Sequence, residues 1–350
     1  MTKTPSVWIV VLNWNGLADT LACLQSLSQL HYSECHIVVV DNGSTDGSVN
    51  VLRGAAPSPA IDIIEAGRNL GYAGGNNLGI RHALDRDADF ILVLNNDTTV
   101  DPALVDELVG AAGQHPDAGC FGPWIYYMHD PERLWFATAT WVSDSLAFAW
   151  PGKDRLVSEL SIAATRTAYV CGAALFFRAS LSRQIGLLDE RFFLVYEESD
   201  WCYRARRAGF ECMTVPSARV WHRVGSSFGS EASPLRTYFS TRNKLLWAEK
   251  NASRREWFRL VRRAGRRVYP ELRFDRGNRV PVHKALLWTA TGFAREWSRK
   301  LRDPQEVAHR RGVFDYFMRR FGDCPRKIRA LSQTWASTQG MAAPPRHLGN

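Results

Sequence analysis

The chain has 350 residues, 45% of them apolar, which is enough for one large domain or two modest ones. Its seven cysteines are scattered, form no CxxC pair and are odd in number, which argues against a disulfide framework or a zinc knuckle and suits a reducing cytoplasm. No window reaches the roughly 18 to 20 uninterrupted apolar residues of a membrane span, and we expect no signal peptide.

Charge is distributed unevenly along the chain. Residues 1–230 carry 17 basic and 25 acidic side chains, a net charge of −8, whereas residues 231–350 carry 27 and 10, a net charge of +17. This asymmetry indicates two functional regions and favours a polyanionic partner for the second, such as nucleic acid, anionic lipid or a phosphate-bearing substrate. The alternative is a solvated, arginine-rich helical surface.

Strand and helix patterns alternate over residues 5–125. The stretch 7–14 is typical of a buried strand, and leucines near a 3.6-residue period predict a helix over 17–27. Further strands are expected at 36–40, 61–67 and 89–97, with a helix opening at "GGNNLGIRHAL", residues 74–84, and another from Asp101-Pro102. This alternation predicts an α/β fold with a doubly wound, mostly parallel sheet.

The rhythm changes after residue 125. Residues 130–178 are aromatic and strand-like, most clearly over 167–178, and a polar helix is expected at 197–209. Short strands follow around 213–215 and 218–222. From residue 234 the pattern is mostly helical, with interleaved Trp and Arg, and we expect the tail to be disordered.

Several expected strands end on polar side chains, which places these groups along one edge of the sheet, where ligands bind in open parallel sheets. They are Asn13, Asn15, Asp41, Asn95, Asn96 and Asp97. Asp97 is suited to a hard cation such as Mg²⁺ or Mn²⁺, or to an ordinary cap before the next helix. Asp41 is suited to a base or ribose contact, or to a turn in "DNGSTDG".

The Gly-rich stretch "RNLGYAGGNNLG", residues 68–79, fails both the G-x-G-x-x-G spacing and the P-loop pattern. It remains a candidate for close approach of backbone to a ligand. Arg68 is available for a phosphate, and Asn69 and Asn76 of the same stretch are candidate nucleotide contacts.

A second acidic cluster, Glu197, Glu198 and Asp200, opens the polar helix. Negative charge is favourable at a helix start, so a capping role is one interpretation. The other is that Glu198 is a general base whose pKa its neighbours and partial burial raise. His222, after a short strand, is either structural or a metal ligand if the fold brings it beside Asp97.

Taken together, the segments "VVLNWNG", "VVVDNGSTDGS", "NLGYAGGNNLGI", "LVLNNDT", "CGAALFFR", "GLLDERFFLVYEESDWCYRARRAGF" and "VWHRVGSS" resemble family 2 glycosyltransferases. The sequence is most similar to the bacterial rhamnosyltransferase-like and galactofuranosyltransferase-like branch. The resemblance covers residues 6–245, and a fainter likeness extends to about Gly322.

The resemblance implies a GT-A fold. We expect a catalytic domain over 1–230, with a nucleotide-binding half at 5–125 and an acceptor-binding half at 126–230. A basic helical region over 231–325 and a disordered tail over 326–350 follow.

The resemblance also assigns roles to the polar residues. Asp97 matches the family's metal motif, and His222 matches a histidine that completes the metal site. Glu198 matches the second acid of the Glu-Asp motif and is the expected catalytic base. Nucleotide or substrate contacts are expected from Asn13, Asn15, Asp41, Arg68, Asn69, Asn76, Asn95, Asn96, Glu197 and Asp200.

The implied activity is inverting transfer of a sugar from a nucleotide-diphospho-sugar to a hydroxyl of a glycan or lipid-linked glycan, in bacterial cell-surface polysaccharide synthesis. The donor sugar and nucleobase are left open. The expected location is cytoplasmic, with a peripheral membrane association through 231–325 and a homo-oligomer as candidates.

Three rival interpretations are weighed. A sugar nucleotidyltransferase normally has a basic residue in its N-terminal Gly-rich loop, which "VVLNWNGLAD" lacks. A nucleic-acid-binding protein fits the pI of about 9.3, but the chain has no zinc spacing or RNP-like motif, so we expect no nucleic acid partner. A catalytically inactive carbohydrate-binding relative is disfavoured by the intact Asp97, Glu198 and His222.

Overall fold

The computed structural model describes residues 3–54, 61–224, 232–268, 298 and 301–339. The chain divides into two compact units, Met1–Ser226 and Ser227–Pro345, and each is described by itself. The boundary expected at residue 230 falls within 225–231, outside the described residues. The segment "KALLWTATGF", which carries part of the fainter family likeness, also lies outside them.

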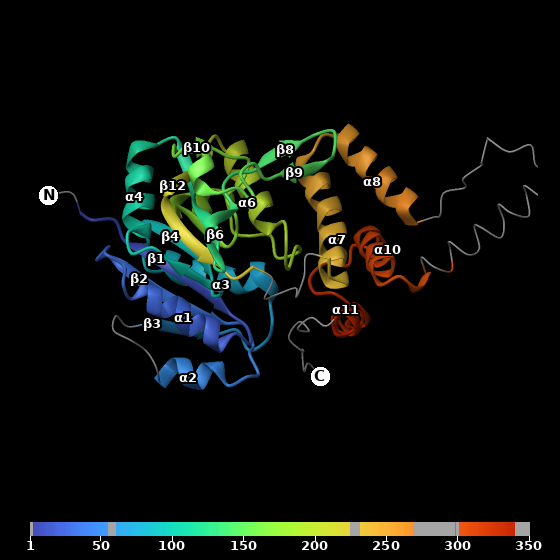
Figure 1. Ribbon diagram of the computed structural model, residues 1–350, viewed down its shortest axis with the longest axis horizontal. Coiled ribbons are helices and arrows are strands. Elements are labelled where there is room, and N and C mark those ends of the chain that lie inside the picture. Colours follow the sequence, from blue (N-terminus) through green and yellow to red (C-terminus); the bar gives the residue numbers. More distant parts are fainter. Residues whose placement is uncertain (1–2, 55–60, 225–231, 269–297, 299–300, 340–350) are drawn as a thin grey trace, which may run out of the picture. The chain divides into compact units, whose positions relative to one another are not determined.

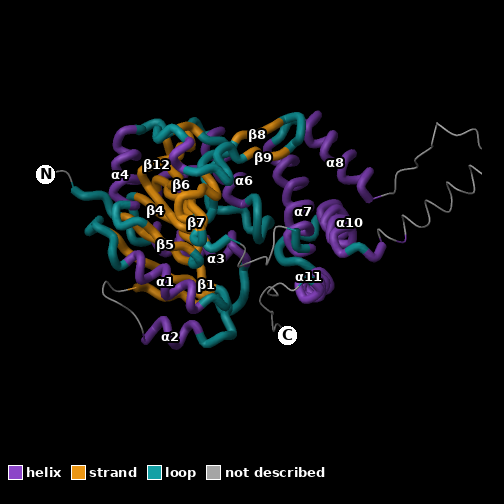
Figure 2. Tube along the Cα trace, in the orientation of Figure 1, coloured by secondary structure: helices purple, strands orange, loops and turns teal. Residues whose placement is uncertain are grey.

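The first unit is built on one large sheet with the strand order β10-β12-β6-β11-β4-β1-β2-β3 (Figures 1 and 2). Strands β1, β2, β3 and β4 are mutually parallel, as are β6 and β12, whereas β11 is antiparallel to both of its neighbours. The predicted mostly parallel α/β sheet is therefore confirmed. The strands are β1 Val7–Asn13, β2 Cys35–Asp41, β3 Ile61–Glu65, β4 Phe90–Asn95, β5 Thr98–Val100, β6 Ala118–Tyr127, β7 Asp130–Phe136, β8 Thr140–Val142, β9 Ala147–Ala149, β10 Thr165–Arg166, β11 Ala174–Arg178 and β12 Glu211–His222.

Helices follow most strands of the first unit, as the alternating pattern predicts. The short strands expected at 213–215 and 218–222 are instead parts of the single strand β12, whose register against β6 shifts between Val215 and Arg219. The helices are α1 Leu17–Leu27, α2 Ser48–Gly54, α3 Gly71–Leu84, α4 Leu104–Gln114, α5 Ala179–Ile185 and α6 Glu197–Arg207, with a short 3₁₀ turn, η1, at Val157–Glu159.

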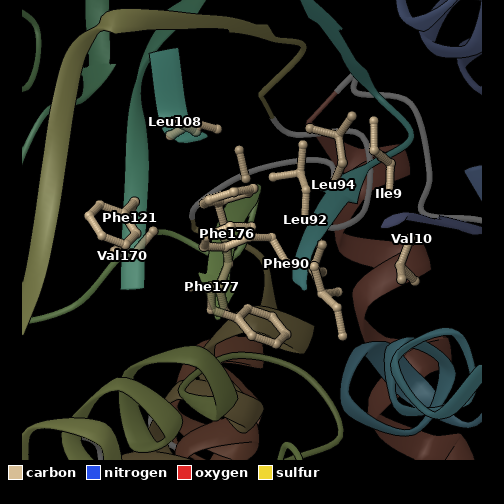
Figure 3. Close-up of a cluster of buried hydrophobic side chains, with 14 of the residues drawn as sticks. Ile9, Val10, Phe90, Leu92, Leu94, Leu108, Phe121, Val170, Phe176 and Phe177 are labelled. Atoms are coloured by element: carbon tan, nitrogen blue, oxygen red, sulfur yellow. The ribbon is translucent and has the colours of Figure 1, made fainter. Parts of the chain in front are cut away.

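The core of the first unit is the apolar interior of this sheet. Ile9, Val10 and Leu92 are fully buried, and Phe90 stacks on Phe176 with ring centroids 5.0 Å apart (Figure 3). Helix α3 packs unusually close to β1, because a Cβ added at Gly79 would lie 2.3 Å from a methyl carbon of Val10. Burial of both faces explains why β1 and β4 read as continuous apolar runs.

The carboxyl ends of the central strands are in register. Asn13 at the end of β1 pairs with Asp41 at the end of β2, and Leu12 pairs with Asn95 at the end of β4. The polar residues that follow these strands therefore share one edge of the sheet, as predicted from their positions after apolar runs.

The second unit is helical in its described part. Helix α7 (Pro234–Asn251) packs against α8 (Arg254–Val268), α10 (Pro304–Phe317) and α11 (Arg326–Thr338). At its centre Arg242 is fully buried, donates to the carbonyl oxygen of Gly322 at 2.7 Å and lies over the rings of Tyr238 and Phe239.

Helix α11 lies where the sequence analysis expects a disordered tail, so that expectation is wrong for residues 326–338. Ile328, Ser332 and Ala336 are buried at a four-residue spacing, which gives this segment one face to pack. None of the helices in the described parts of the chain combines the length and hydropathy that a membrane-spanning segment requires.

Candidate functional site

Asp97 and His222 meet at the carboxyl edge of the sheet. The Nε2 atom of His222 lies 3.1 Å from Oδ1 of Asp97, and both side chains are more than nine-tenths buried. They meet because β5 pairs antiparallel with the end of β12, with Thr98 opposite His222. The fold therefore brings His222 beside Asp97, as its role as a candidate metal ligand requires.

The donor set of this pair suits a hard divalent cation. Two adjacent ligands of an octahedral ion with bonds of about 2.1 Å lie about 3.0 Å apart, close to the observed separation. Nδ1 of His222 is buried and has no hydrogen-bond partner among the described residues. The ring of Trp135 covers His222 edge-on at a centroid distance of 4.6 Å.

The two asparagines before Asp97 have structural partners. Asn96 donates through Nδ2 to Thr20 Oγ1 at 2.9 Å and to the carbonyl of Gly16 at 3.4 Å, so it ties the end of β4 to the start of α1. The carbonyl of Asn95 accepts from Thr98 Oγ1 at 2.6 Å, which closes the turn between β4 and β5. Their expected contacts with diphosphate or ribose stay predictions.

Asp41 lies 3% exposed in a hydrogen-bonded turn. Its Oδ1 accepts from Asn13 Nδ2 at 2.9 Å, and its Oδ2 accepts from the backbone N–H of Ser44 at 2.9 Å. Asn15, in a left-handed conformation with φ of 51°, accepts from the N–H of Thr45 at 2.7 Å. Asp41 therefore has the turn-forming role that was one of its two interpretations. Its contact with a nucleobase stays a prediction.

The Gly-rich stretch lies next to this turn. Asn42, the buried residue that follows Asp41 at this edge, accepts from the N–H of Leu70 at 2.9 Å and donates to Asn69 Oδ1 at 3.2 Å. Arg68 is exposed. Asn76 is fully buried and donates to the carbonyl of Tyr72 at 2.9 Å within its own helix. The Oδ1 atom of Asn76 has no partner among the described residues.

The acidic cluster occupies the first turn of α6, and its members have different environments. Asp200 is fully buried and pairs with Arg204 at 3.1 Å, which favours a structural role for it. Glu197 is 4% exposed, and its Oε2 has no partner among the described residues. Burial, reinforced by the charge of Glu198, raises the pKa of Glu197 well above 4.5. Glu198 is half-buried.

Tyr72 lies beside the acidic cluster. Its hydroxyl donates to the carbonyl of Gly172, and a Cβ added at Gly172 would lie 3.0 Å from that hydroxyl and 3.6 Å from Cβ of Glu198. Burial raises the pKa of the Tyr72 phenol, and the negative charges of Glu198 and Asp97 raise it further.

The segment before α6 has an unusual backbone. Phe193, Val195 and Tyr196 all have positive φ, at 65°, 71° and 81°. Each such residue costs on the order of 1–3 kcal/mol, so the surrounding structure must hold it in place. The N–H of Tyr72 donates to the carbonyl of Phe193 at 2.7 Å, and a Cβ at Gly71 would collide with that carbonyl at 2.4 Å. The Gly-rich stretch thus fixes the approach to Glu197 and Glu198.

A family model described as "Glycosyl transferase family 2" matches residues 7–185 of the chain. The match covers the sheet edge that carries Asn13, Asp41 and Asp97. The chain belongs to glycosyl transferase family 2.

Curated relatives of this glycosyltransferase come from the branch that its motifs indicate. It is 28% identical over 228 residues to the N-acetylglucosaminyl-diphospho-decaprenol L-rhamnosyltransferase of Mycobacterium tuberculosis, a match that covers 59% of this chain and 73% of the relative. It is 30% identical over 228 residues to the galactofuranosyltransferase GlfT1 of the same organism, covering 64% and 72%. The resemblance stated from the motifs is confirmed.

A solved structure shows the same fold. The mannosyltransferase PcManGT of Pyrobaculum calidifontis, in complex with GDP-Man and Mn²⁺, superposes with a TM-score of 0.54 and 14% identity over 90% of this chain and 88% of that chain. The GT-A fold expected for this glycosyltransferase is confirmed. The family assignment does not favour the rival interpretations as a sugar nucleotidyltransferase or a basic nucleic-acid-binding protein.

The sequence analysis did not identify Tyr72 or Trp135 as site residues of this glycosyltransferase. Tyr72 lies in the Gly-rich stretch of residues 68–79, where glycines permit close packing. Those neighbouring glycines are the sequence feature that could have indicated it. Trp135 lies in an aromatic stretch without a motif, and only the packing of β7 against β6 brings its ring near His222.

The raised pKa of Glu197 predicts a loss of stability as the pH rises. Above 4.5 the unfolded chain releases this proton while the folded chain retains it, so the folded state binds more protons and stability falls up to the folded pKa. Each unit of the shift is worth about 1.4 kcal/mol. The substitution Glu197→Gln should remove this pH dependence, raising the melting temperature relative to wild type more at pH 8 than at pH 5.

The measurement is thermal unfolding followed by circular dichroism at both pH values, with Glu159→Gln, an exposed carboxylate in the same unit, as the control. A Glu197→Gln variant with the same pH profile as wild type contradicts a neutral Glu197.

Proposed function

We propose that this glycosyltransferase is metal-dependent and inverting, and that it moves a sugar from a nucleotide-diphospho-sugar to a hydroxyl of a glycan or lipid-linked glycan. The observation that carries the proposal is the buried Asp97–His222 pair at the carboxyl edge of the sheet, whose oxygen and nitrogen atoms suit a divalent cation. In the proposal this pair holds the cation, and Glu198 is the carboxylate base.

In this proposal the Asp97 carboxylate and Nε2 of His222 hold the divalent cation, Mg²⁺ or Mn²⁺. When bound, the cation offsets the negative charge that develops on a departing diphosphate. A hard oxygen ligand and an imidazole suit either ion. The relative solved with Mn²⁺ and GDP-Man has the same fold, which supports a divalent cation here.

Glu198 is the proposed base. It accepts the proton of the acceptor hydroxyl while the acceptor oxygen bonds to the anomeric carbon and the bond from that carbon to the diphosphate oxygen breaks. A single displacement of this kind inverts the configuration at the anomeric carbon. Glu197, held neutral by burial, adds no second negative charge to repel the diphosphate. Asn13, Asn15, Asp41, Arg68 and the neighbouring amides are proposed to line the nucleotide.

The acceptor proposal draws on the relatives. One relative is named for a sugar joined by diphosphate to decaprenol. We propose a lipid-linked acceptor of the same chemical class, used in cell-envelope polysaccharide synthesis at the cytoplasmic membrane face. A second candidate, a soluble glycan acceptor, differs in needing no membrane surface.

The second unit supports a membrane surface as partner. Helix α8 carries seven arginines in fifteen residues, and Arg254, Arg255, Arg262 and Arg266 are exposed. Phe258 beside them is 60% exposed. An exposed cationic helix with an apolar side chain is suited to an anionic interface, where each Arg near the surface is worth about 1 kcal/mol.

Removal of the Asp97 carboxylate should abolish the metal site. Asp97→Ala is expected to lose sugar transfer and to lose the Mn²⁺-dependent part of nucleotide binding, because one of the two proposed ligands is gone. Isothermal titration with nucleoside diphosphate, with and without Mn²⁺, measures this, and Asp106→Ala on the exposed side of α4 is the control. Near wild-type turnover of Asp97→Ala overturns the metal assignment.

Replacement of the proposed base should separate catalysis from donor binding. Glu198→Gln keeps size and polarity, so donor affinity should stay within a few fold, while kcat falls by roughly 10²–10⁴-fold, the usual contribution of a general base. Kinetics of transfer and donor titration give the two values, with Glu159→Gln as the control. Weakened donor binding with unchanged kcat assigns Glu198 to binding instead.

Flotation with vesicles tests the membrane partner. The protein should float with vesicles containing anionic lipid at low salt, and less so at high salt, because salt screens the arginines. Arg254→Gln combined with Arg262→Gln should reduce flotation, whereas Arg53→Gln combined with Arg155→Gln, in the first unit, should not. Protein that stays in the bottom fraction at low salt argues against docking and favours the soluble acceptor.

A further inference from the structure

Three cysteines that are distant in sequence converge in the core of the first unit. Cys120 lies on β6, Cys202 on α6 and Cys212 on β12, and their three sulfur atoms all lie within 4.8 Å of one another. Each side chain is fully buried. Cys120 and Cys212 are direct partners across two parallel strands, and α6 packs on the same pair of strands.

The sulfur of Cys202 is the centre of this group. It accepts a hydrogen bond from the backbone N–H of Val170 at 3.5 Å. Burial opposes ionisation of Cys202, but the neighbouring thiols of Cys120 and Cys212, the Val170 N–H and the charge of Arg204 together hold its pKa below that of an ordinary thiol. The Cys212 thiol itself donates to the carbonyl oxygen of Cys202 at 3.8 Å. A buried sulfur that receives several donors is the environment in which a thiolate persists.

We propose that Cys120, Cys202 and Cys212 form a binding site for a soft monovalent cation of the Cu(I) type, separate from the glycosyltransferase site. Thiolate sulfur is the ligand that soft ions prefer. A trigonal ion with bonds of about 2.3 Å, the usual length for a thiolate ligand, needs sulfur atoms about 4 Å apart, so small side-chain movements suffice.

The number of ligands and the charge both select the ion. Structural zinc takes four ligands, whereas among the described residues this group of candidate ligands contains only three sulfurs. A monovalent ion held by the thiolate of Cys202 and the two neutral thiols of Cys120 and Cys212 carries no net charge, and a dry core accepts a neutral group at the lowest cost. Binding forms three copper–sulfur bonds, the Cys202 thiol releases its proton to solvent, and no oxidation state changes.

The site has a structural consequence. Cys202 stands one helical turn after Glu198 on α6, and Cys212 lies on the strand that ends at His222. A bound ion therefore links the helix that carries the proposed base to the strand that carries the proposed metal ligand. Because the three ligands come together only in the folded chain, binding stabilises the fold and raises the melting temperature.

The test is anaerobic titration of the reduced full-length protein with Cu(I) in competition with bicinchoninate. Wild type should retain about one Cu(I) per chain, and Cys202→Ala, Cys120→Ala and Cys212→Ala should each lose it. Cys35→Ala and Cys324→Ala remove cysteines outside the group and should bind like wild type. Asp97→Ala and Glu198→Gln should also retain Cu(I), which separates this proposal from the proposed function.

X-ray absorption of copper-loaded wild type provides a measurement that needs no variant and answers the question even if a cysteine variant does not fold. Three sulfur scatterers support the site. Failure of wild type to retain Cu(I), a shell with nitrogen or oxygen ligands, or equal loss of binding in Cys35→Ala and Cys202→Ala overturns the proposal.

Discussion

The antiparallel pairing of β5 with the end of β12 is the constraint on which the candidate site depends. It places Thr98 opposite His222, and the carbonyl of Asp97 accepts from the N–H of Arg223 at 2.9 Å, so the backbone itself holds Asp97 and His222 together. A slip of one residue in this register would turn His222 to the other face of the sheet. Asp97, which follows β4, and His222, more than 100 residues later, are thus held together by main-chain hydrogen bonds. Their pairing does not require a ligand.

The carboxylates of the candidate site have different neighbours, and these neighbours determine which role each carboxylate suits. Asp97 faces an imidazole, Asp200 faces Arg204, and Glu197 has its pKa raised by burial beside Glu198. Three fully ionised acids in one helical turn would repel one another, so a neutral Glu197 relieves the repulsion that the sequence alone suggests. The half-buried Glu198 is the member of the cluster that suits proton transfer.

Close backbone packing makes this edge rigid. Gly172 leaves room for the Tyr72 hydroxyl and for Glu198, and Gly71 leaves room for the carbonyl of Phe193 within a segment of positive φ. The strain in that segment is held by hydrogen bonds from the start of α3. The proposed base is therefore supported by the same Gly-rich stretch that forms hydrogen bonds with Asn42, next to Asp41. The basic second unit has a different property, a row of exposed arginines on α8.

The sequence by itself determined the alternation of strands and helices, the parallel sheet and the edge at which the polar residues gather, because each follows from local apolar runs and the residues that end them. Its motifs also determined the family. Only the tertiary structure decided that Asp97 meets His222 and that Asn96 and Asp41 are already engaged by Thr20, Asn13 and Ser44. It also decided that the Tyr72 hydroxyl and Glu198 approach each other at Gly172. It likewise decided that α11 is a packed helix, and that Cys120, Cys202 and Cys212 converge. These are contacts between segments far apart in the chain, and they depend on strand register and burial, which no local pattern of residues specifies.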